Sequence, residues 1–251
     1  RGRTAPSRPS ETFKGRCTMD FDFMPYFEKY EKLVAAADAA FERVRQAHAE
    51  CVKCAQGCAD CCHAVFDLTL IEALYINHRF KQEFTGAAGS DLQEKANRTD
   101  RLMAKIKRRA QEDLLAGKPE TDILADLARE RVRCPLLNAT DLCALYQYRP
   151  LTCRFYGIPT AIGGGGHTCG LSGFKEGETY PTVNMDSIHS RLQEISAELI
   201  RDMQSRYIKL ADILVPLSTA LITAYDEVYF GLKDAPPDEP PPKRRGPRRQ
   251  S

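Results

Sequence analysis

Residues 51–62 read CVKCAQGCADCC and place five thiols, those of Cys51, Cys54, Cys58, Cys61 and Cys62, within a dozen positions. Cysteines this close together form disulfides, redox pairs or metal sites. Adjacent half-cystines cannot bridge each other without severe strain. A chain of 251 residues with 43% hydrophobic content can also bury a core without disulfide support. Because polarisable thiolate sulfur favours zinc, copper(I) or iron–sulfur centres, the stretch predicts a metal site.

Composition and charge limit the classes of protein that fit. The length allows one or two domains. The net charge of +2 is uneven, since residues 1–16 carry +4 and residues 234–251 carry +2, which leaves −4 for the rest. A mildly acidic body argues against a groove for nucleic acid. No apolar run approaches the roughly 20 residues that a transmembrane helix needs. We expect a cytoplasmic protein with no transmembrane segment, although a start at Arg1 leaves a lost leader open.

Both ends of the chain lack the apolar periodicity of a folded segment. Residues 1–19 are basic and rich in Ser and Pro, and residues 234–251 are rich in Pro and Arg. Such composition predicts disordered tails around a single helical domain of residues 20–233. Cys17 lies far from the other thiols and is expected to be a free cysteine. The basic C-terminal tail could contact anionic lipid or nucleic acid, with a solvated tail as the ordinary explanation.

The residues before and after the first cysteine block predict helices. From Phe27 to His48 apolar positions recur at alternating spacings of three and four, which is one face of a helix leading to Cys51. His48 lies on that face and is a candidate nitrogen ligand, although packing is the more ordinary role. Thr69 and Glu72 form a capping box that opens a second helix, which should stop near Gly86.

Further apolar periods predict a mainly α fold around an irregular cysteine-rich centre. Ser90 is expected to open a third helix, with a basic run at 105–109 on its solvated sides. Its expected apolar face consists of Leu92, Ala96, Leu102, Met103, Ile106 and Leu114. A fourth helix should end just before Cys134. A stripe from Ile188 is expected to continue to Pro216, and a last helix should run from Leu217 to Gly231.

A second cysteine block follows at residues 134–169. It contains Cys134-Pro135-Leu136-Leu137, Cys143-Ala144-Leu145-Tyr146, Arg149-Pro150-Leu151-Thr152-Cys153-Arg154 and Cys169. Read with Cys54-x3-Cys58-x2-Cys61-Cys62, this pattern resembles the YkgJ-type cysteine-cluster family of zinc- or iron-chelating proteins, known by its CxxxCxxCC motif. The resemblance spans about residues 51–170. It implies metal binding by the eight matching thiols, which are those of Cys54, Cys58, Cys61, Cys62, Cys134, Cys143, Cys153 and Cys169.

Two more residues are candidate ligands. Cys51 departs from the family pattern by adding a further Cys-x-x-Cys pair, which leaves open whether Cys51 or Cys54 is the first ligand. His167 lies two residues before Cys169 and is a substitute nitrogen ligand. The Gly163–Gly166 run lacks the Walker lysine of a phosphate loop. It is expected to be a flexible connector that lets Cys169 fold back onto the site.

Residues beside the thiols fit a supporting role. Pro135 and Pro150 restrict the backbone next to candidate ligands. Arg149 and Arg154 flank Cys153 and could offset thiolate charge, or else pair with surface carboxylates. The rings of Tyr146 and Phe155 are expected to shield the centre from water.

Several functions remain open at this stage. We expect an iron–sulfur centre, with 4Fe-4S as its expected form, in a protein of metal handling or electron transfer. Adjacent Cys61 and Cys62 are hard to place on one tetrahedral ion, whose sulfurs lie about 2.3 Å from the metal. The first alternative is a zinc-binding structural or interaction module, because eight thiolates would make two four-ligand sites.

Enzymatic readings have less support from the residues. The family resemblance extends more distantly to a flagellin lysine methylase, so a cluster-dependent protein-modifying enzyme is the second alternative. No S-adenosylmethionine loop and no nucleophile with an orienting His and Asp is recognisable. A thiol oxidoreductase built on Cys51 and Cys54 lacks the βαβ context of that motif. Whether the protein is an enzyme, which protein partner it has and its oligomeric state stay open.

Overall fold

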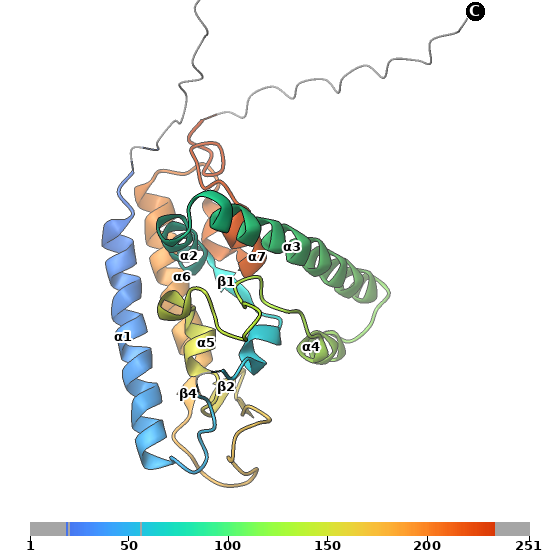
Figure 1. Cartoon of the computed structure of the whole chain (residues 1–251). Coiled ribbons are helices and arrows are strands. Elements are labelled where there is room, and N and C mark those ends of the chain that lie inside the picture. Colours follow the sequence, from blue (N-terminus) through green and yellow to red (C-terminus); the bar gives the residue numbers. More distant parts are fainter. Residues whose placement is uncertain (1–18, 20, 56, 234–251) are drawn as a thin grey trace, which may run out of the picture.

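The structure is a computed structural model that describes residues 19, 21–55 and 57–233 (Figure 1). The predictions for Cys17 and for tails at 1–19 and 234–251 lie outside these residues, except at Met19, which is partly buried. Within them the chain is mainly α, as predicted. The helices are α1 (Met24–Ala47), α2 (Leu70–Glu83), α3 (Gly86–Leu115), α4 (Glu120–Arg129), α5 (Leu151–Phe155), α6 (Met185–Asp202) and α7 (Leu217–Ile222), with 3-10 turns η1 (Asp60–His63), η2 (Tyr146–Tyr148) and η3 (Ile208–Asp212).

Five short strands form two small sheets. They are β1 (Asp67–Thr69), β2 (Thr160–Ile162), β3 (Gly165–His167), β4 (Val183–Asn184) and β5 (Leu214–Pro216). β1 pairs antiparallel with β5, and β2 lies between antiparallel β3 and parallel β4. Gly163 and Gly164, with φ of 56° and 80°, form the turn from β2 to β3. The glycine run therefore forms a hairpin, whose tight turn requires left-handed backbone. The prediction of a flexible connector was wrong.

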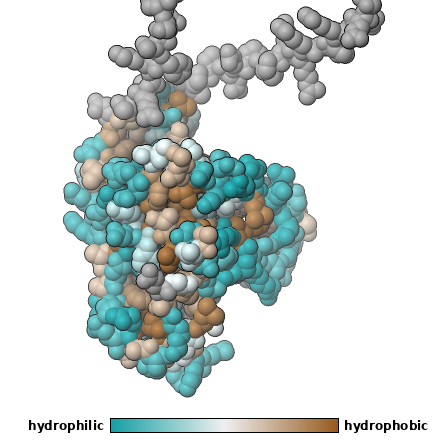
Figure 2. Space-filling model, in the orientation of Figure 1, coloured by the Kyte–Doolittle hydropathy of each residue, from teal (hydrophilic) through white to brown (hydrophobic). Residues whose placement is uncertain are grey.

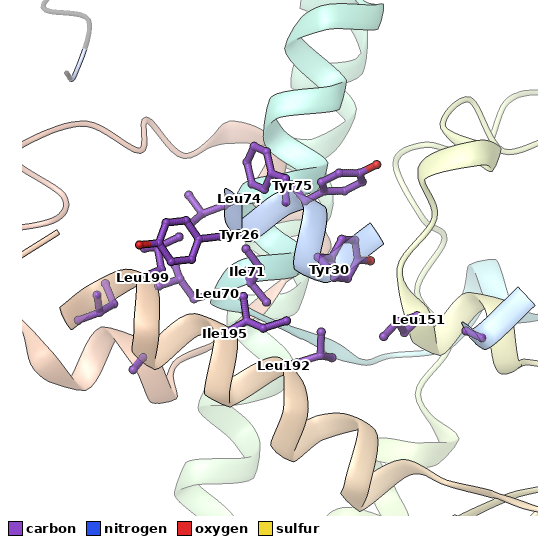
Figure 3. Packing of buried hydrophobic residues seen from close by; sticks show 14 of the residues in the cluster. Tyr26, Tyr30, Leu70, Ile71, Leu74, Tyr75, Leu151, Leu192, Ile195 and Leu199 are labelled. Carbon is purple, nitrogen blue, oxygen red and sulfur yellow. The ribbon is translucent and has the colours of Figure 1, made fainter. Parts of the chain in front are cut away.

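The larger apolar core lies between α1, α2 and α6 (Figures 1 and 3). Leu70 and Ile71 of α2 lie between Tyr30 of α1 and Leu199 of α6, and each of these four side chains is fully or almost fully buried. Burying one such aliphatic side chain stabilises the fold by about 1.5–3 kcal/mol. The Ser196 hydroxyl accepts a hydrogen bond from the Ile71 backbone N–H at 3.2 Å, which fixes α2 against α6.

A second core lies on the opposite side of α2. Ile76 and Phe80 pack there with residues of α3 and α7 and with Leu136 and Leu145 from the second cysteine block. The partly buried Cys134 and Cys143 also pack against this core. Helix α2 is consequently buried on two faces, and its predicted capping box of Thr69 and Glu72 is present. The cysteine-rich segments are thus attached to a helix that is buried on two faces.

Helix α3 differs from its prediction at its start and on its apolar face. It begins at Gly86, with Thr85 as the capping position, and Ser90 lies inside the helix, where its hydroxyl donates back to the Gly86 carbonyl at 3.1 Å. Leu102 and Leu114 of the predicted face are exposed. Beyond the second core, Met103 and Ile106 of this helix pack with Val132 and Leu127, and this small cluster leaves Leu102 and Leu114 uncovered. The basic run is solvated only in part, since Lys107 pairs with Asp67 and Arg109 with Glu130.

The C-terminal third also differs from its prediction. The helical stripe ends at Asp202, and the residues up to Pro216 form η3 and β5 instead. Pro216 has no backbone N–H and lies at the end of the strand, opposite Asp67. Helix α7 ends at Ile222 rather than at Gly231. Among the described helices, none combines the length and the hydropathy needed to cross a membrane. On the face seen in Figure 2, hydrophilic residues dominate and hydrophobic ones gather toward the middle.

Candidate metal centre

The first cysteine block lies between α1 and β1. Helix α1 ends at Ala47, and the backbone N–H of Cys51 donates to the His48 carbonyl at 2.9 Å. Cys61 and Cys62 are part of the 3-10 turn η1, in which the Cys62 N–H donates to the Ala59 carbonyl at 3.0 Å. This turn therefore fixes the backbone of the adjacent cysteine pair.

The second block lies directly against that turn. The backbone N–H of Cys134 donates to the Cys62 carbonyl at 2.7 Å, and that of Val132 donates to the His63 carbonyl at 2.9 Å. The segments continue as an isolated antiparallel bridge between Ala64 and Arg131. Backbone hydrogen bonds thus bring together two cysteine blocks that are about seventy residues apart in the sequence.

Cys143 and Cys153 are positioned by local structure and by buried side chains. The Ala144 N–H donates to the Leu136 carbonyl at 2.8 Å, which folds Cys143 back toward Cys134. Cys153 lies on α5, where Glu72 accepts a hydrogen bond from the Leu151 N–H at 3.1 Å. Glu72 is 3% exposed, and burial raises the pKa of its carboxyl.

Three neighbouring cavities contain the eight predicted thiols in their walls. The inner cavity, of about 60 Å³, is lined by five thiols and mostly apolar side chains. A larger cavity of about 480 Å³ and an outer one of about 190 Å³ adjoin it. The inner cavity is lined by Cys61, Cys62, Cys134, Cys143 and Cys153, the larger by Cys54, Cys58, Cys61, Cys62, Cys143 and Cys153, and the outer by Cys54, Cys58, Cys61 and Cys169.

Cys61 is the one thiol shared by the walls of all three cavities. Within the described part of the chain, no three or more Cys, His, Asp or Glu side chains are drawn together closely enough to hold a metal ion as they stand. The thiols surround spaces rather than a single point. In its chemistry the donor set, composed of thiols, matches soft metals.

The thiols at the inner cavity differ widely in pKa. The pKa of Cys61 is lowered to about 3 because the thiols of Cys153 and Cys62 donate hydrogen bonds to it. Those same hydrogen bonds, together with burial, raise the pKa of Cys153 and of Cys62 well above their ordinary value. Burial raises the pKa of Cys134 to about 12. A metal that binds here must therefore displace protons from most of its thiol ligands.

Arg149 supplies positive charge to this region. Its guanidinium stacks on Tyr146, with the central carbon 4.1 Å from the ring centroid, and both residues line the larger cavity. Burial raises the pKa of Cys54 and of Cys143, and the charge of Arg149 opposes that rise. Arg149 therefore favours the thiolate forms, as predicted from its place beside Cys153.

Arg154 has a structural role. Its side chain is 5% exposed and pairs with Asp38 at 2.6 Å. It also donates to the carbonyls of Arg149, at 3.0 Å, and Gln147. The guanidinium thus joins α1 to the segment that precedes α5. The alternative of a pair with a surface carboxylate is confirmed for Arg154, since Asp38 is about half exposed, although the arginine itself is buried.

The two predicted shielding rings lie in different environments. Phe155 is 2% exposed and belongs to the larger apolar core, so it does not cover the thiols. Tyr146 lines the larger cavity but is 57% exposed. Phe155 faces the core because α5 is a single short helix whose buried side packs against α1.

Asp60 and Tyr156 are site residues that sequence reasoning missed. The Asp60 carboxylate accepts hydrogen bonds from the Tyr156 hydroxyl at 3.0 Å and from Arg131 at 2.5 Å, and the Cys169 thiol donates to it at 3.9 Å. Although burial acts to raise it, the pKa of Asp60 is lowered by the hydrogen bonds from Arg131 and Tyr156. The position of Asp60 between Cys58 and Cys61 was the available signal.

The extra cysteine Cys51 and the candidate His48 lie apart from these cavities. The Cys51 side chain is 7% exposed, its thiol donates to Glu50 at 3.5 Å, and it is absent from the three cavity linings. Cys54 reaches the cavities because Gly157, at φ 103°, leaves room for it, and a Cβ there would lie 2.8 Å from the Cβ of Cys54. The His48 ring packs against Tyr180, with centroids 5.3 Å apart.

The other candidate nitrogen ligand, His167, is exposed on β3. It lines a further cavity together with Cys169 but without the other candidate thiols. The structure thus brings the eight thiols of the family pattern to one region and places Cys51, His48 and His167 outside the three cavities described above.

Comparison with known proteins agrees with this geometry. Residues 53–170 match the family model CxxCxxCC, described as a "putative zinc- or iron-chelating domain". The predicted resemblance to the cysteine-cluster family is confirmed over this segment, which is a little under half of the chain. The match includes the eight cavity-lining thiols and leaves Cys51 just outside, and it supports metal binding through the cysteines. No curated protein and no solved structure matches the chain.

Proposed function

We propose that the cysteine cluster holds an iron–sulfur centre through thiolates of both blocks, and that the protein acts in electron transfer or metal handling. The observation that carries this proposal is the position of Cys61 and Cys62, which line the same cavities as thiols of the second block. Two adjacent thiols are hard to place on one small tetrahedral ion. A multi-iron centre that accepts thiolates from several directions, or two centres that meet at this pair, relieves that constraint.

The proposed ligands come from the eight cavity-lining thiols, with Cys62, Cys134, Cys143 and Cys153 as the set in the most apolar surroundings. When bound, such a centre takes up and releases single electrons at a potential set by burial, charge and hydrogen bonds. The chain contributes the rest. The charge of Arg149 offsets that of the thiolates, and the apolar side chains around the inner cavity exclude water.

We expect an iron–sulfur protein to show itself directly on anaerobic purification. The preparation should be brown, bleach with dithionite and contain iron together with acid-labile sulfide. Iron, zinc and sulfide would be measured on one sample expressed with ample iron. A colourless protein with about two zinc ions and no sulfide would replace this proposal with a zinc-binding structural module, since eight thiolates suffice for two four-ligand sites.

We also propose that residues 20–233 form one domain and contain everything the centre needs. All eight candidate thiols and the described cores lie within these limits, except for the partly buried Met19, which packs against the larger core. A chain of residues 20–233 should therefore keep the metal content and the melting temperature of the full chain. Both would be measured side by side. Metal loss or precipitation of the shortened chain would show that a tail contributes to the site.

A further inference from the structure

The inner and outer cavities divide the thiols into two groups, while the larger cavity is lined by members of both. Cys62, Cys134, Cys143 and Cys153, here called the inner group, line the inner cavity. Cys54, Cys58 and Cys169, here called the outer group, line the outer cavity and are absent from the inner one. Cys61 belongs to both linings and joins the two groups.

The inner group is held by rigid structure. Cys134 and Cys143 pack against the second apolar core, and the Cys134 N–H is bonded to the Cys62 carbonyl at 2.7 Å. Cys153 lies on α5, whose first residue is fixed by buried Glu72 at 3.1 Å. Segments with buried contacts and protected backbone hydrogen bonds open rarely. A metal in the inner group would therefore exchange slowly.

The outer group lies on loops. Cys54 is exposed. Among the described residues, the backbone of Cys58 makes one hydrogen bond to another backbone group, in which its N–H donates to the Ala55 carbonyl at 3.0 Å. Cys169 lies in the loop after β3, where the Leu171 N–H donates to its sulfur at 3.4 Å. Loop segments of this kind open easily and reach partners and solvent.

A carboxylate accompanies the outer group and is missing from the inner one. Asp60 accepts a hydrogen bond from the Cys169 thiol at 3.9 Å and is itself fixed by Tyr156 and Arg131. It therefore holds Cys169 beside the outer cavity. Asp60 is not part of the lining of the outer cavity, so its role at this site is to position Cys169.

We infer that the outer group and Cys61, with Asp60 as a positioning residue for Cys169, form a separate exchange site for a single thiophilic divalent ion such as Zn²⁺ or Fe²⁺, while the inner group holds the resident centre. The inference rests on the proposed function, because it needs a resident centre from which the exchange site differs. Binding forms metal–sulfur bonds and releases thiol protons to solvent, and no electron is transferred. The site would load or unload metal at the surface while the inner centre stays in place.

Cobalt(II) is a suitable probe because thiolate ligation gives it intense charge-transfer absorption. The full-length protein, as isolated anaerobically, would be titrated with cobalt chloride and then treated with EDTA. We expect about one equivalent of cobalt to bind and to be removed by EDTA, while the iron and sulfide of the resident centre remain. Replacing Cys54→Ser, Cys169→Ser or Asp60→Asn should weaken cobalt binding at least about tenfold and leave the resident centre unchanged.

Cys51→Ser is the matched control, since Cys51 is the neighbouring thiol outside the three linings, and it should bind cobalt as the wild type does. Cobalt binding that is absent, or that Cys169→Ser does not weaken, overturns the exchange site. So does loss of the resident centre in Cys169→Ser, because the thiols would then serve one centre. A wild-type protein that carries no metal as isolated refutes the proposed function instead.

Discussion

Cys153→Ser is expected to remove the metal of the inner group and to lower the melting temperature of the isolated protein by roughly 6–12 °C. The serine hydroxyl is a poor ligand for soft metals. Metal binding is coupled to folding, so its loss removes stabilisation. A loss of about 3 kcal/mol shifts the melting temperature of a chain of this size by this much, at roughly 2–4 °C per kcal/mol. The apolar cores should keep the variant folded.

Metal content and melting temperature would be measured on the same anaerobic samples. Cys51→Ser serves as the control, because Cys51 is also buried but lies outside the three cavities. It should keep its metal and lose little stability. Cys58→Ser should lose only metal bound by the outer group, with a smaller change in melting temperature, since Cys58 lies on a loop. An unchanged metal content and melting temperature in Cys153→Ser would refute a centre shared by the two cysteine blocks.

Sequence periodicity predicted the parts of the fold that depend on local interactions. The helix that leads to the first cysteines and the capping box of Thr69 and Glu72 are present in the structure. Both signals act within a few residues, so a single segment contains them. The convergence of the two cysteine blocks was predicted because both carry candidate ligands for the same kind of metal.

Long-range pairing limited what the sequence could tell about the C-terminal third. Leu210 and Leu214 fit a helical stripe, but Leu214 and Val215 pair with Thr69 and Leu68 instead. That pairing depends on residues about 145 positions away, which no local period records. The predicted helix start at Ser90 was also wrong. Ser90 resembles a helix cap but lies inside α3, which already begins at Gly86.

The environment of the site was predicted for some residues and not for others. Arg149 lies beside the thiols as expected. Arg154 also lines the larger cavity, but its guanidinium is engaged by Asp38 of α1 and by backbone carbonyls. Asp60 and Tyr156 meet only through folding, since 96 residues separate them. Sequence spacing shows which residues are near the thiols in the chain and not which direction their side chains take.

Arg154 provides the second large effect. Arg154→Ala should lower the free energy of unfolding by about 2–4 kcal/mol, because it leaves the carbonyls of Arg149 and Gln147 without their buried donor. Asp38 is about half exposed and can be solvated, so it adds little to this cost. The variant should also bind the metal of the inner group about 10–100-fold more weakly, because α5 carries Cys153.

The control for Arg154→Ala is Arg191→Ala, an exposed arginine on α6 paired with exposed Glu194 at 2.7 Å. Such surface pairs contribute only up to about 1 kcal/mol, so this control should unfold close to wild type. Arg154→Lys can restore the pair with Asp38 but not both carbonyl bonds, because an ammonium lacks the planar fork of donors. Its stability should fall between those of wild type and Arg154→Ala. Denaturant unfolding of the metal-free proteins under reducing conditions measures these differences, and metal titration measures the affinities. If Arg154→Ala binds metal as tightly as wild type, α5 does not need its arginine to place Cys153.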